Sequence, residues 1–399
     1  MRFLLIMFSV ILLSGCLSSP SSRPGNIIKK YIKKMTLEEK IGQLFILAIR
    51  RDKHGNFCRY FNSDIEDILY KYKPGGIVLF NENLYSISQL KRFILDIQNS
   101  SRIPMFIAID EEGGKISRLN RNRNFHTTTI PSGRVIGRKN DAESAVIVGT
   151  IIGKELRSLG INMDFAPVAD INTNPGNPVI GTRAYGSNPE IVSKISTAVT
   201  EGLQGENVCS VIKHFPGHGD TFSDPHKGTA LVFHTLERLY RCEFLPFKAG
   251  IKKGVDGIMT AHILLPKITG NRIPATFSRY LLTDILRTKL KYEGLIITDS
   301  LTMKAVSNQW TSDKAALMAI EAGVDIILMP ESPEKAYNAV LRAVRNGEIS
   351  IKRIDASIIR ILKAKLKRKI LYPDKTEMDP EEILGCKEHK RNIAELFSK

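Results

Sequence analysis

The sequence predicts an α/β fold, a single (β/α)8 barrel of the TIM type, and three observations support this. Short apolar runs rich in Val, Ile and Phe alternate with longer segments that have the apolar periodicity of helices. Eight such runs can be counted, and eight strand–helix units close this barrel. Titratable residues follow the third to the seventh run, and active sites in this barrel form at the carboxyl ends of the strands.

The expected strands and helices alternate along the whole chain. The strands span residues 44–49, 76–80, 105–109, 163–166, 209–212, 257–261, 295–298 and 325–329. Helices are expected between them, including residues 63–72, 86–98, 142–159, 189–203, 236–253, 279–290 and 333–346. The lysine-rich run 363–369 is interpreted as the solvated face of a closing helix. This alternation predicts a parallel sheet and needs no second domain.

Several polar residues stand where these strands end. In chain order they are Asp110, Asp170 after Pro167, Lys213 with His214, His262 and Asp299. Because the carboxyl ends of parallel barrel strands meet at one mouth, we expect this end to carry the active site.

The composition restricts the class of protein. Hydrophobic residues make up 43% and charged residues 25% of the chain, as in an ordinary soluble globular protein. The formal net charge of +17 comes from Lys and Arg residues scattered along the chain, without basic arms interleaved with aromatic residues. Nucleic acid is therefore not an expected partner. The charge reflects either a Lys-rich composition or long-range attraction to anionic lipid or wall polymer.

The N-terminus has the features of an exported lipoprotein. Arg2 precedes an apolar stretch over residues 3–13 that suits a signal-peptide core and is too short to span a bilayer comfortably. The tetrad Leu-Ser-Gly-Cys that ends at Cys16 resembles the bacterial lipoprotein box, and a Ser/Pro-rich tether follows it. We expect lipidation at Cys16 and anchoring to the bacterial cell envelope. A simple signal peptide is the alternative.

The expected organisation has four parts: a signal peptide over residues 1–15, a tether over 16–26, the barrel over 27–372 and a charged C-terminal appendage over 373–399. Four further cysteines show no Cys-x-x-Cys spacing, and their pairing stays open. They are Cys58, Cys209, Cys242 and Cys386.

The segment Lys-His-Phe-Pro-Gly-His-Gly-Asp-Thr over residues 213–221 is the most informative motif, and Asp224, Pro225 and His226 follow it. His214 and His218 have the spacing of helical zinc ligands, but Pro216 and Gly217 between them argue against a helix. Asp224 and His226 are two residues apart, so both face one side of an extended stretch. A nearby carboxylate favours the protonated imidazole, which makes His226 a usable proton donor. A plain surface Asp–His pair is the alternative.

This segment resembles the signature of glycoside hydrolase family 3, in its bacterial β-N-acetylglucosaminidase branch. Two further motifs occur in the expected order: Ile-Asp-Glu-Glu-Gly-Gly over residues 109–114 with Arg118, and Gly-Leu-Ile-Ile-Thr-Asp-Ser-Leu-Thr-Met over residues 294–303. Ile-Gly-Thr-Arg-Ala-Tyr-Gly over residues 180–186 adds a fourth. The resemblance covers about residues 28–370 and implies the same barrel.

The resemblance also implies roles for particular residues. Asp299 is expected to be the nucleophile, His226 the general acid/base and Asp224 its partner. The residues expected to hold the terminal sugar are Asp110, Arg118, Arg183, Lys213 and His214. His262 is left without a role, since it is either a neighbour of the site or a core histidine. One residue departs from the pattern: Pro225 stands where the family usually has Ser, and proline fixes φ and removes an amide donor.

The implied activity is a retaining exo-β-N-acetylhexosaminidase that acts on peptidoglycan-derived sugars without a metal or an organic cofactor. We expect a monomer. The alternatives are a β-glucosidase, an N-acetylglucosaminide phosphorylase and, from another class, an inactive sugar-binding lipoprotein.

Overall fold

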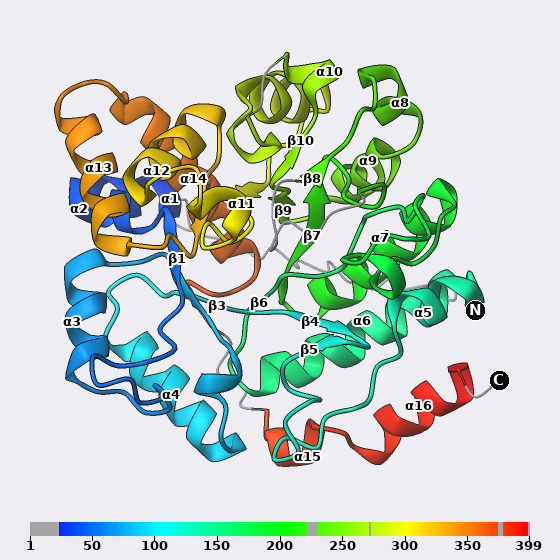
Figure 1. Ribbon diagram of the computed structural model, residues 1–399. Helices are drawn as coiled ribbons and strands as arrows, with labels where there is room; N and C mark the ends of the chain where they lie inside the picture. The colour runs from blue at the N-terminus through cyan, green and yellow to red at the C-terminus, as the bar shows by residue number, and fades with distance from the viewer. Residues whose placement is uncertain (1–23, 222–229, 271–272, 374–377, 398–399) are drawn as a thin grey trace, which may run out of the picture.

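The computed structural model describes residues 24–221, 230–270, 273–373 and 378–397, and Figure 1 shows their arrangement. No helix within these ranges is long and apolar enough to cross a membrane. The site residues Asp224 and His226, together with Pro225, lie outside the described residues, as does Cys16.

Eight parallel strands form the central sheet, in the order β11-β9-β7-β6-β3-β2-β1-β12. A parallel bridge between Ile297 and Ile326 joins the two outer strands, so the sheet is nearly closed into a barrel. The predicted α/β barrel and each of its eight strands are therefore confirmed. The strands are β1 (Phe45–Leu47), β2 (Gly76–Val78), β3 (Phe106–Ile109), β6 (Met163–Asp164), β7 (Cys209–Phe215), β9 (Gly257–Thr260), β11 (Leu295–Ile297) and β12 (Ile327–Leu328).

Helices surround this sheet (Figure 1). The longer ones between the strands are α3 (Ser63–Tyr72), α4 (Ile87–Asn99), α6 (Ala142–Ser158), α7 (Pro189–Gly205), α9 (Phe244–Lys253), η5 (Tyr280–Lys289) and α12 (Ser312–Ala322). After the last strand come α13 (Pro333–Arg345) and α14 (Ile351–Lys367). Local sequence sets their starts: in α7, for example, Asn188 caps the amides of Glu190 and Ile191, and Pro189 occupies the first turn.

One predicted helix is divided. The segment expected to be helical over residues 236–253 forms α8 (Leu236–Arg241) and α9, separated at Cys242, whose φ of −134° and ψ of −82° are not helical. Pro246 lies in the first turn of α9, where its missing amide hydrogen costs nothing. The apolar periodicity therefore predicted helical structure on both sides of Cys242, but it did not predict the interruption between the two helices.

The amino-terminal end of the barrel is covered by α14, against which α1 (Pro24–Lys34) packs. Lys365 of α14 is fully buried; its Nζ donates to Oε1 of Gln43 at 2.7 Å and lies 4.9 Å from the ring centroid of Phe106. The expectation that residues 363–369 form a solvated face is therefore wrong at this position. The apolar side of α14 continues through Lys365 because its long stem packs like a hydrophobic side chain.

The C-terminal residues pack on the outside of the barrel. Helices α15 (Pro380–Ile383) and α16 (Lys387–Phe397) contact α6. The buried carboxylate of Glu155 on α6 accepts hydrogen bonds from the amide of Gly385 at 2.9 Å and from the hydroxyl of Thr128 at 2.6 Å. His389 lies 3.2 Å from the same carboxylate. The described part of this segment therefore adds helices to the barrel surface and no strand.

Candidate active site

A cavity of about 510 Å³ opens at the carboxyl end of the barrel strands. Apolar and charged side chains line it together, and the charged ones include Asp110 after β3, Lys213 within β7 and Asp299 after β11. Six of the predicted site residues line it together: Asp110, Arg118, Arg183, Lys213, His214 and Asp299. Segments that are far apart in the sequence thus meet where this fold builds its active sites.

A shift of register in β7 directs two of these side chains. Lys213 pairs with Met259 of β9, and Phe215 pairs with the next residue, Thr260, so His214 is an extra residue in the strand. Such a bulge changes the direction of neighbouring side chains. As a result Lys213 and His214 both line the cavity, although they are adjacent in the chain.

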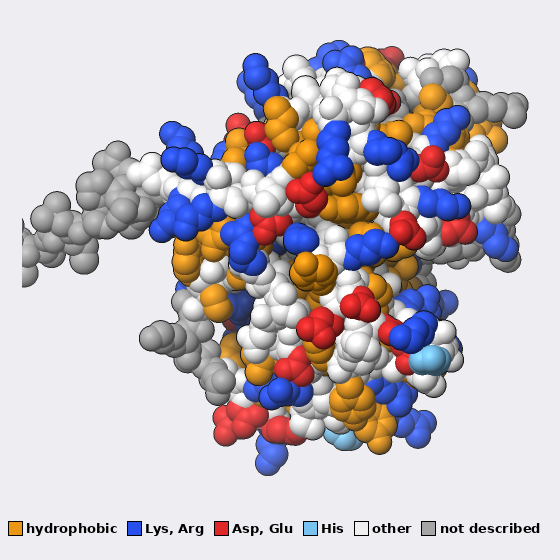
Figure 2. All heavy atoms as spheres, turned by 90° about the vertical axis from the view of Figure 1, so that its left-hand side faces the viewer, with side chains coloured by type: hydrophobic (Ala, Val, Ile, Leu, Met, Phe, Trp, Pro, Cys, Tyr) orange, Lys and Arg blue, Asp and Glu red, His pale blue; other side chains and the backbone are white. Residues whose placement is uncertain are grey.

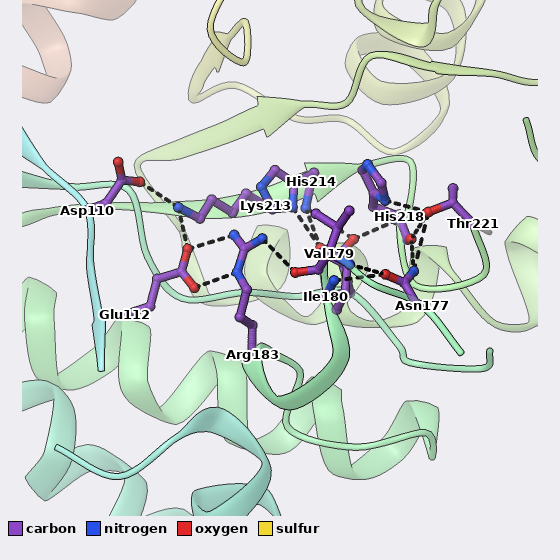
Figure 3. A network of polar contacts seen from close by, with 11 residues as sticks. Asp110, Glu112, Asn177, Val179, Ile180, Arg183, Lys213, His214, His218 and Thr221 are labelled. Atoms are coloured by element: carbon purple, nitrogen blue, oxygen red, sulfur yellow. Dashed lines mark hydrogen bonds and ion pairs between the residues drawn. The ribbon is translucent and has the colours of Figure 1, made fainter. Parts of the chain in front are cut away.

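Alternating charges run along one wall of the cavity (Figure 3). The Nζ of Lys213 lies 2.8 Å from Oδ1 of Asp110 and 2.7 Å from Oε1 of Glu112. Glu112 accepts two hydrogen bonds from the guanidinium of Arg183, at 2.9 and 2.8 Å. Arg118 approaches the other oxygen of Asp110 at 3.2 Å. Each buried charge therefore has an opposite charge beside it, which offsets the cost of desolvation.

The pKa shifts of this wall have a common cause. Burial by itself would raise the pKa of Asp110, but Lys213 and Arg118 hold it below its usual range. Burial would likewise raise the pKa of Glu112, but the positive charges of Arg183 and Lys213 hold it far below the ordinary value. Burial would lower the pKa of Lys213, but Asp110 and Glu112 raise it. The wall therefore stays fully ionised and offers fixed charges to a polar ligand.

Two acids of this region were not predicted as site residues: Glu112, which lines the cavity, and Glu111, which lies behind it. Glu112 was quoted only as part of the Asp-Glu-Glu motif, yet it fixes both Lys213 and Arg183. Glu111 is buried and accepts the amides of Arg118 at 2.8 Å and Leu119 at 3.0 Å, so it shapes the turn that carries Arg118. Burial raises the pKa of Glu111 to about 7. The signal in the sequence was the run of three acids after a strand, which does not distinguish their roles.

Asp170 organises the histidines beside the wall. Its carboxylate lies 2.7 Å from Nδ1 of His214 and accepts the amide of His218 at 2.6 Å. Burial would raise the pKa of Asp170, but His214 holds it below its usual range. Asp170 was predicted only as a residue near a strand end, and the structure shows that it orients the ring of His214, the expected sugar ligand.

His218 secures the last described turn of this loop. Burial lowers its pKa to about 4, so its ring is neutral at pH 7. Its Nδ1 lies 2.8 Å from the hydroxyl of Thr221, and its carbonyl accepts from the side-chain amide of Asn177 at 2.9 Å (Figure 3). His218 therefore acts as a structural anchor here.

Asp299 is half-buried at the cavity edge, in the turn after β11. One of its carboxylate oxygens accepts the amide of Ser300 at 2.7 Å. The carbonyl of Ser300 in turn lies 3.0 Å from Nε2 of His262, whose Nδ1 is 2.8 Å from the hydroxyl of Thr276. His262, which was left without a role, therefore supports the turn that presents Asp299.

The described residues contain no group of three His, Cys, Asp or Glu side chains arranged to hold a metal ion. The four cysteines within the described ranges are free thiols, so the pairing left open by the sequence is not formed among them.

Comparison with known proteins agrees with this geometry. The model of the glycosyl hydrolase family 3 N terminal domain matches residues 36–364. The chain belongs to glycosyl hydrolase family 3. The family resemblance drawn from the motifs is thereby confirmed, and so is the prediction that the chain is a glycoside hydrolase.

Several proteins that this chain resembles are named as hexosaminidases, and one similar solved structure, at 26% identity and a TM-score of 0.83, is named as the beta-glucoside phosphorylase BglX. Beta-hexosaminidase A of Pseudoalteromonas piscicida is 34% identical in an alignment of 397 positions that covers 91% of this chain and 66% of that protein. Beta-hexosaminidase LpqI of Mycobacterium tuberculosis is 29% identical, in an alignment that covers 81% of this chain and 81% of that protein. The solved structure of a glycoside hydrolase family 3 beta-N-acetylglucosaminidase from Paenibacillus sp. str. FPU-7 superposes with a TM-score of 0.84 at 37% identity, covering 91% of this chain and 68% of that chain.

Proposed function

We propose that this family 3 chain is a retaining exo-β-N-acetylhexosaminidase that removes terminal N-acetylglucosamine from peptidoglycan-derived sugars. The observation that carries the proposal is the position of Asp299, whose carboxylate lines the same cavity as the charged wall around Asp110 and Lys213. A nucleophilic carboxylate facing a pocket of fixed polar groups suits the transfer of a terminal sugar. The names of the relatives support the choice of sugar.

The charged wall would hold the terminal sugar. Asp110 can accept hydrogen bonds from sugar hydroxyls, while Lys213, Arg118 and His214 donate to sugar oxygens. Glu112 would act indirectly, because its contacts are with Lys213 and Arg183. Fixed contacts of this kind reduce the entropy lost when the sugar reaches its reactive position.

In the first step Asp299 attacks the anomeric carbon, a glycosyl–Asp299 ester forms and the bond to the departing oxygen breaks. His226, with Asp224 as its partner, gives a proton to that oxygen. In the second step His226 takes a proton from water, which attacks the ester and releases the sugar with retained configuration. The roles of His226 and Asp224 come from the sequence motif, and neither a metal nor an organic cofactor takes part in this scheme.

We further propose that the enzyme is exported and anchored to the cell envelope through a lipid on Cys16. The support is the Leu-Ser-Gly-Cys tetrad and the apolar stretch before it. Loss of membrane association in Cys16→Ser, with its hexosaminidase activity kept, is the expected result of cell fractionation. Unchanged detergent-dependent association would contradict the anchor.

Hydrolysis of p-nitrophenyl N-acetyl-β-glucosaminide, with and without inorganic phosphate, tests the activity. We expect release of free N-acetylglucosamine at a rate that phosphate does not change. Formation of the sugar phosphate would identify a phosphorylase, and a preference for the glucoside would identify a β-glucosidase. Absence of turnover together with measurable sugar binding would indicate an inactive sugar-binding lipoprotein.

A further inference from the structure

The end of the barrel opposite the cavity carries a basic surface, which we call the basal face. It consists of α1, the exposed side of α14 and the loop before β11. The lysines of α1 are Lys29, Lys30, Lys33 and Lys34, all exposed, and α1 contains no acidic residue. Among the described residues, no carboxylate lies within ion-pairing distance of these four. Their charges therefore face solvent.

The loop before β11 and α14 extend this basic surface across the barrel. Lys291 and Lys363 line one shallow hollow of about 380 Å³ together with Gly254 and Arg360, whose guanidinium is already paired with Asp325 at 3.1 Å. Gly254 comes just before β9 and Lys291 just before β11, so the hollow lies at the amino-terminal ends of the strands. Glu293 is an exposed acid on its rim, and the acid Asp355 of α14 is already paired with Lys40 at 2.7 Å. Asp256, which also lines the hollow, is paired with Lys367 and Arg368, so the exposed lysines leave the basal face with an excess of positive charge.

The basal face also carries exposed apolar side chains close to these lysines. Ile359 on α14 is 37% exposed and Tyr372, just after α14, is 55% exposed. Cationic side chains interspersed with exposed apolar and aromatic ones suit a surface that lies on the headgroups of a bilayer.

The position of the N-terminus indicates which partner this surface would meet, namely the bilayer that holds the expected lipid anchor. Figure 2 shows several Lys and Arg side chains on one face of the molecule. The lysines of α1 belong to the end opposite the cavity, because α1 packs on α14, which contacts residues just before β1 and β9. Cys16, the expected lipidation site, is eight residues before Pro24. Eight residues span at most about 27 Å when fully extended, so a bilayer that held the lipid would lie within reach of the basal face.

We infer that the basal face docks on an anionic lipid bilayer and turns the mouth of the cavity away from the membrane. This inference rests on the proposed envelope location and does not depend on the sugar that the enzyme cleaves. The lipid supplies the attachment, and the lysines supply an orientation that a flexible tether alone cannot give. The cavity then faces the side on which wall polymer lies.

The test measures binding of a form that begins at Leu17, and so lacks both the apolar stretch over residues 3–13 and Cys16, to phosphatidylcholine vesicles with and without 30% phosphatidylglycerol. We expect sedimentation with the anionic vesicles only, weakening as salt rises. One lysine near an anionic leaflet contributes a factor of about five, so changing Lys29, Lys30, Lys33 and Lys34 to Gln should weaken binding by nearly three orders of magnitude, about 600-fold. Turnover of the chromogenic substrate should be unchanged, which shows that the variant is folded.

A matched control removes four exposed lysines from the outer helices, Lys91, Lys314, Lys335 and Lys387. It lowers the net charge by the same amount, so binding that falls equally in both variants would show that net charge alone acts and would overturn the inference. Equal binding to neutral vesicles would overturn it too. Binding to soluble poly(glycerol phosphate) that needs the α1 lysines, without binding to vesicles, would assign the basal face to wall polymer instead.

Discussion

The two ends of the barrel use charged residues in opposite ways. At the amino-terminal end, Asp325 is fully buried and accepts from the amide of Ile296 at 2.9 Å and the hydroxyl of Ser357 at 2.6 Å. It also pairs with Arg287 and Arg360. At the carboxyl end, the side chains of Asp110 and Arg118 are 19% and 24% exposed and line the cavity. A saturated network stabilises the fold, whereas a partly exposed one has capacity left for a ligand.

This contrast predicts that substitutions at the two ends separate activity from stability. Changes at the cavity should affect turnover and leave unfolding nearly unchanged, and changes at the opposite end should do the reverse.

The largest expected effect is that of Asp299→Asn. The amide cannot form the covalent intermediate, so kcat should fall by at least a thousandfold, a barrier increase of about 4 kcal/mol. The midpoint of thermal unfolding should move little, because Asp299 is half-buried and its hydrogen bond from the amide of Ser300 can also be accepted by an amide oxygen. Retention of more than about a hundredth of the wild-type rate would remove Asp299 from the nucleophile role.

The next largest effect is a loss of stability caused by a substitution at the amino-terminal end of the barrel. Asp325→Asn leaves Arg287 and Arg360 without their carboxylate, and breaking a buried pair in this way costs about 3–5 kcal/mol. Urea unfolding should show this loss, while kcat of the folded fraction stays as in the wild type. Glu334→Gln is the control, because it breaks the exposed pair with Lys71 and should cost less than about 1 kcal/mol. A large fall in kcat of folded Asp325→Asn would show that the two ends are coupled.

A third prediction concerns the proton donor, which only the sequence assigns. His226→Ala should slow substrates with poor leaving groups about a hundredfold more than aryl substrates whose leaving groups need little protonation. Added azide should restore turnover of the aryl substrate, since azide needs no base to attack the glycosyl ester. Equal slowing of both substrates without azide rescue would indicate that Pro225 marks a real divergence and that another group supplies the proton.

The sequence predicted the strands well because each is a short apolar run, and it predicted the cavity because the polar residues follow those runs. It could not rank the three acids Asp110, Glu111 and Glu112, which differ only in which neighbours the fold brings to them. The orienting role of Asp170 likewise depends on the bulge in β7, and a bulge has no periodic signal.

The smallest expected effect concerns Lys365, which is fully buried at the amino-terminal end of the barrel. Burial lowers the pKa of Lys365 to about 7, whereas the same group titrates near 10.4 in an unfolded chain. Between these two values the unfolded state binds one proton more than the folded state, so the free energy of unfolding rises with pH, by up to about 1.4 kcal/mol per unit. Below pH 7 both states are protonated and the slope vanishes.

Lys365→Met keeps most of the volume and removes the proton. Since the hydrogen bond to Gln43 is lost as well, the net gain in stability at pH 7 should be only about 1 kcal/mol, but the difference in stability between pH 7 and pH 9 should shrink by about 2 kcal/mol. Urea unfolding of both proteins at the two pH values measures this. Lys363→Met, at an exposed position on the same helix, is the control and should leave the pH dependence of the wild type in place. If Lys365→Met has the same pH dependence as the wild type, Lys365 stays charged in the folded protein, and the amino-terminal end tolerates a buried cation without a carboxylate partner.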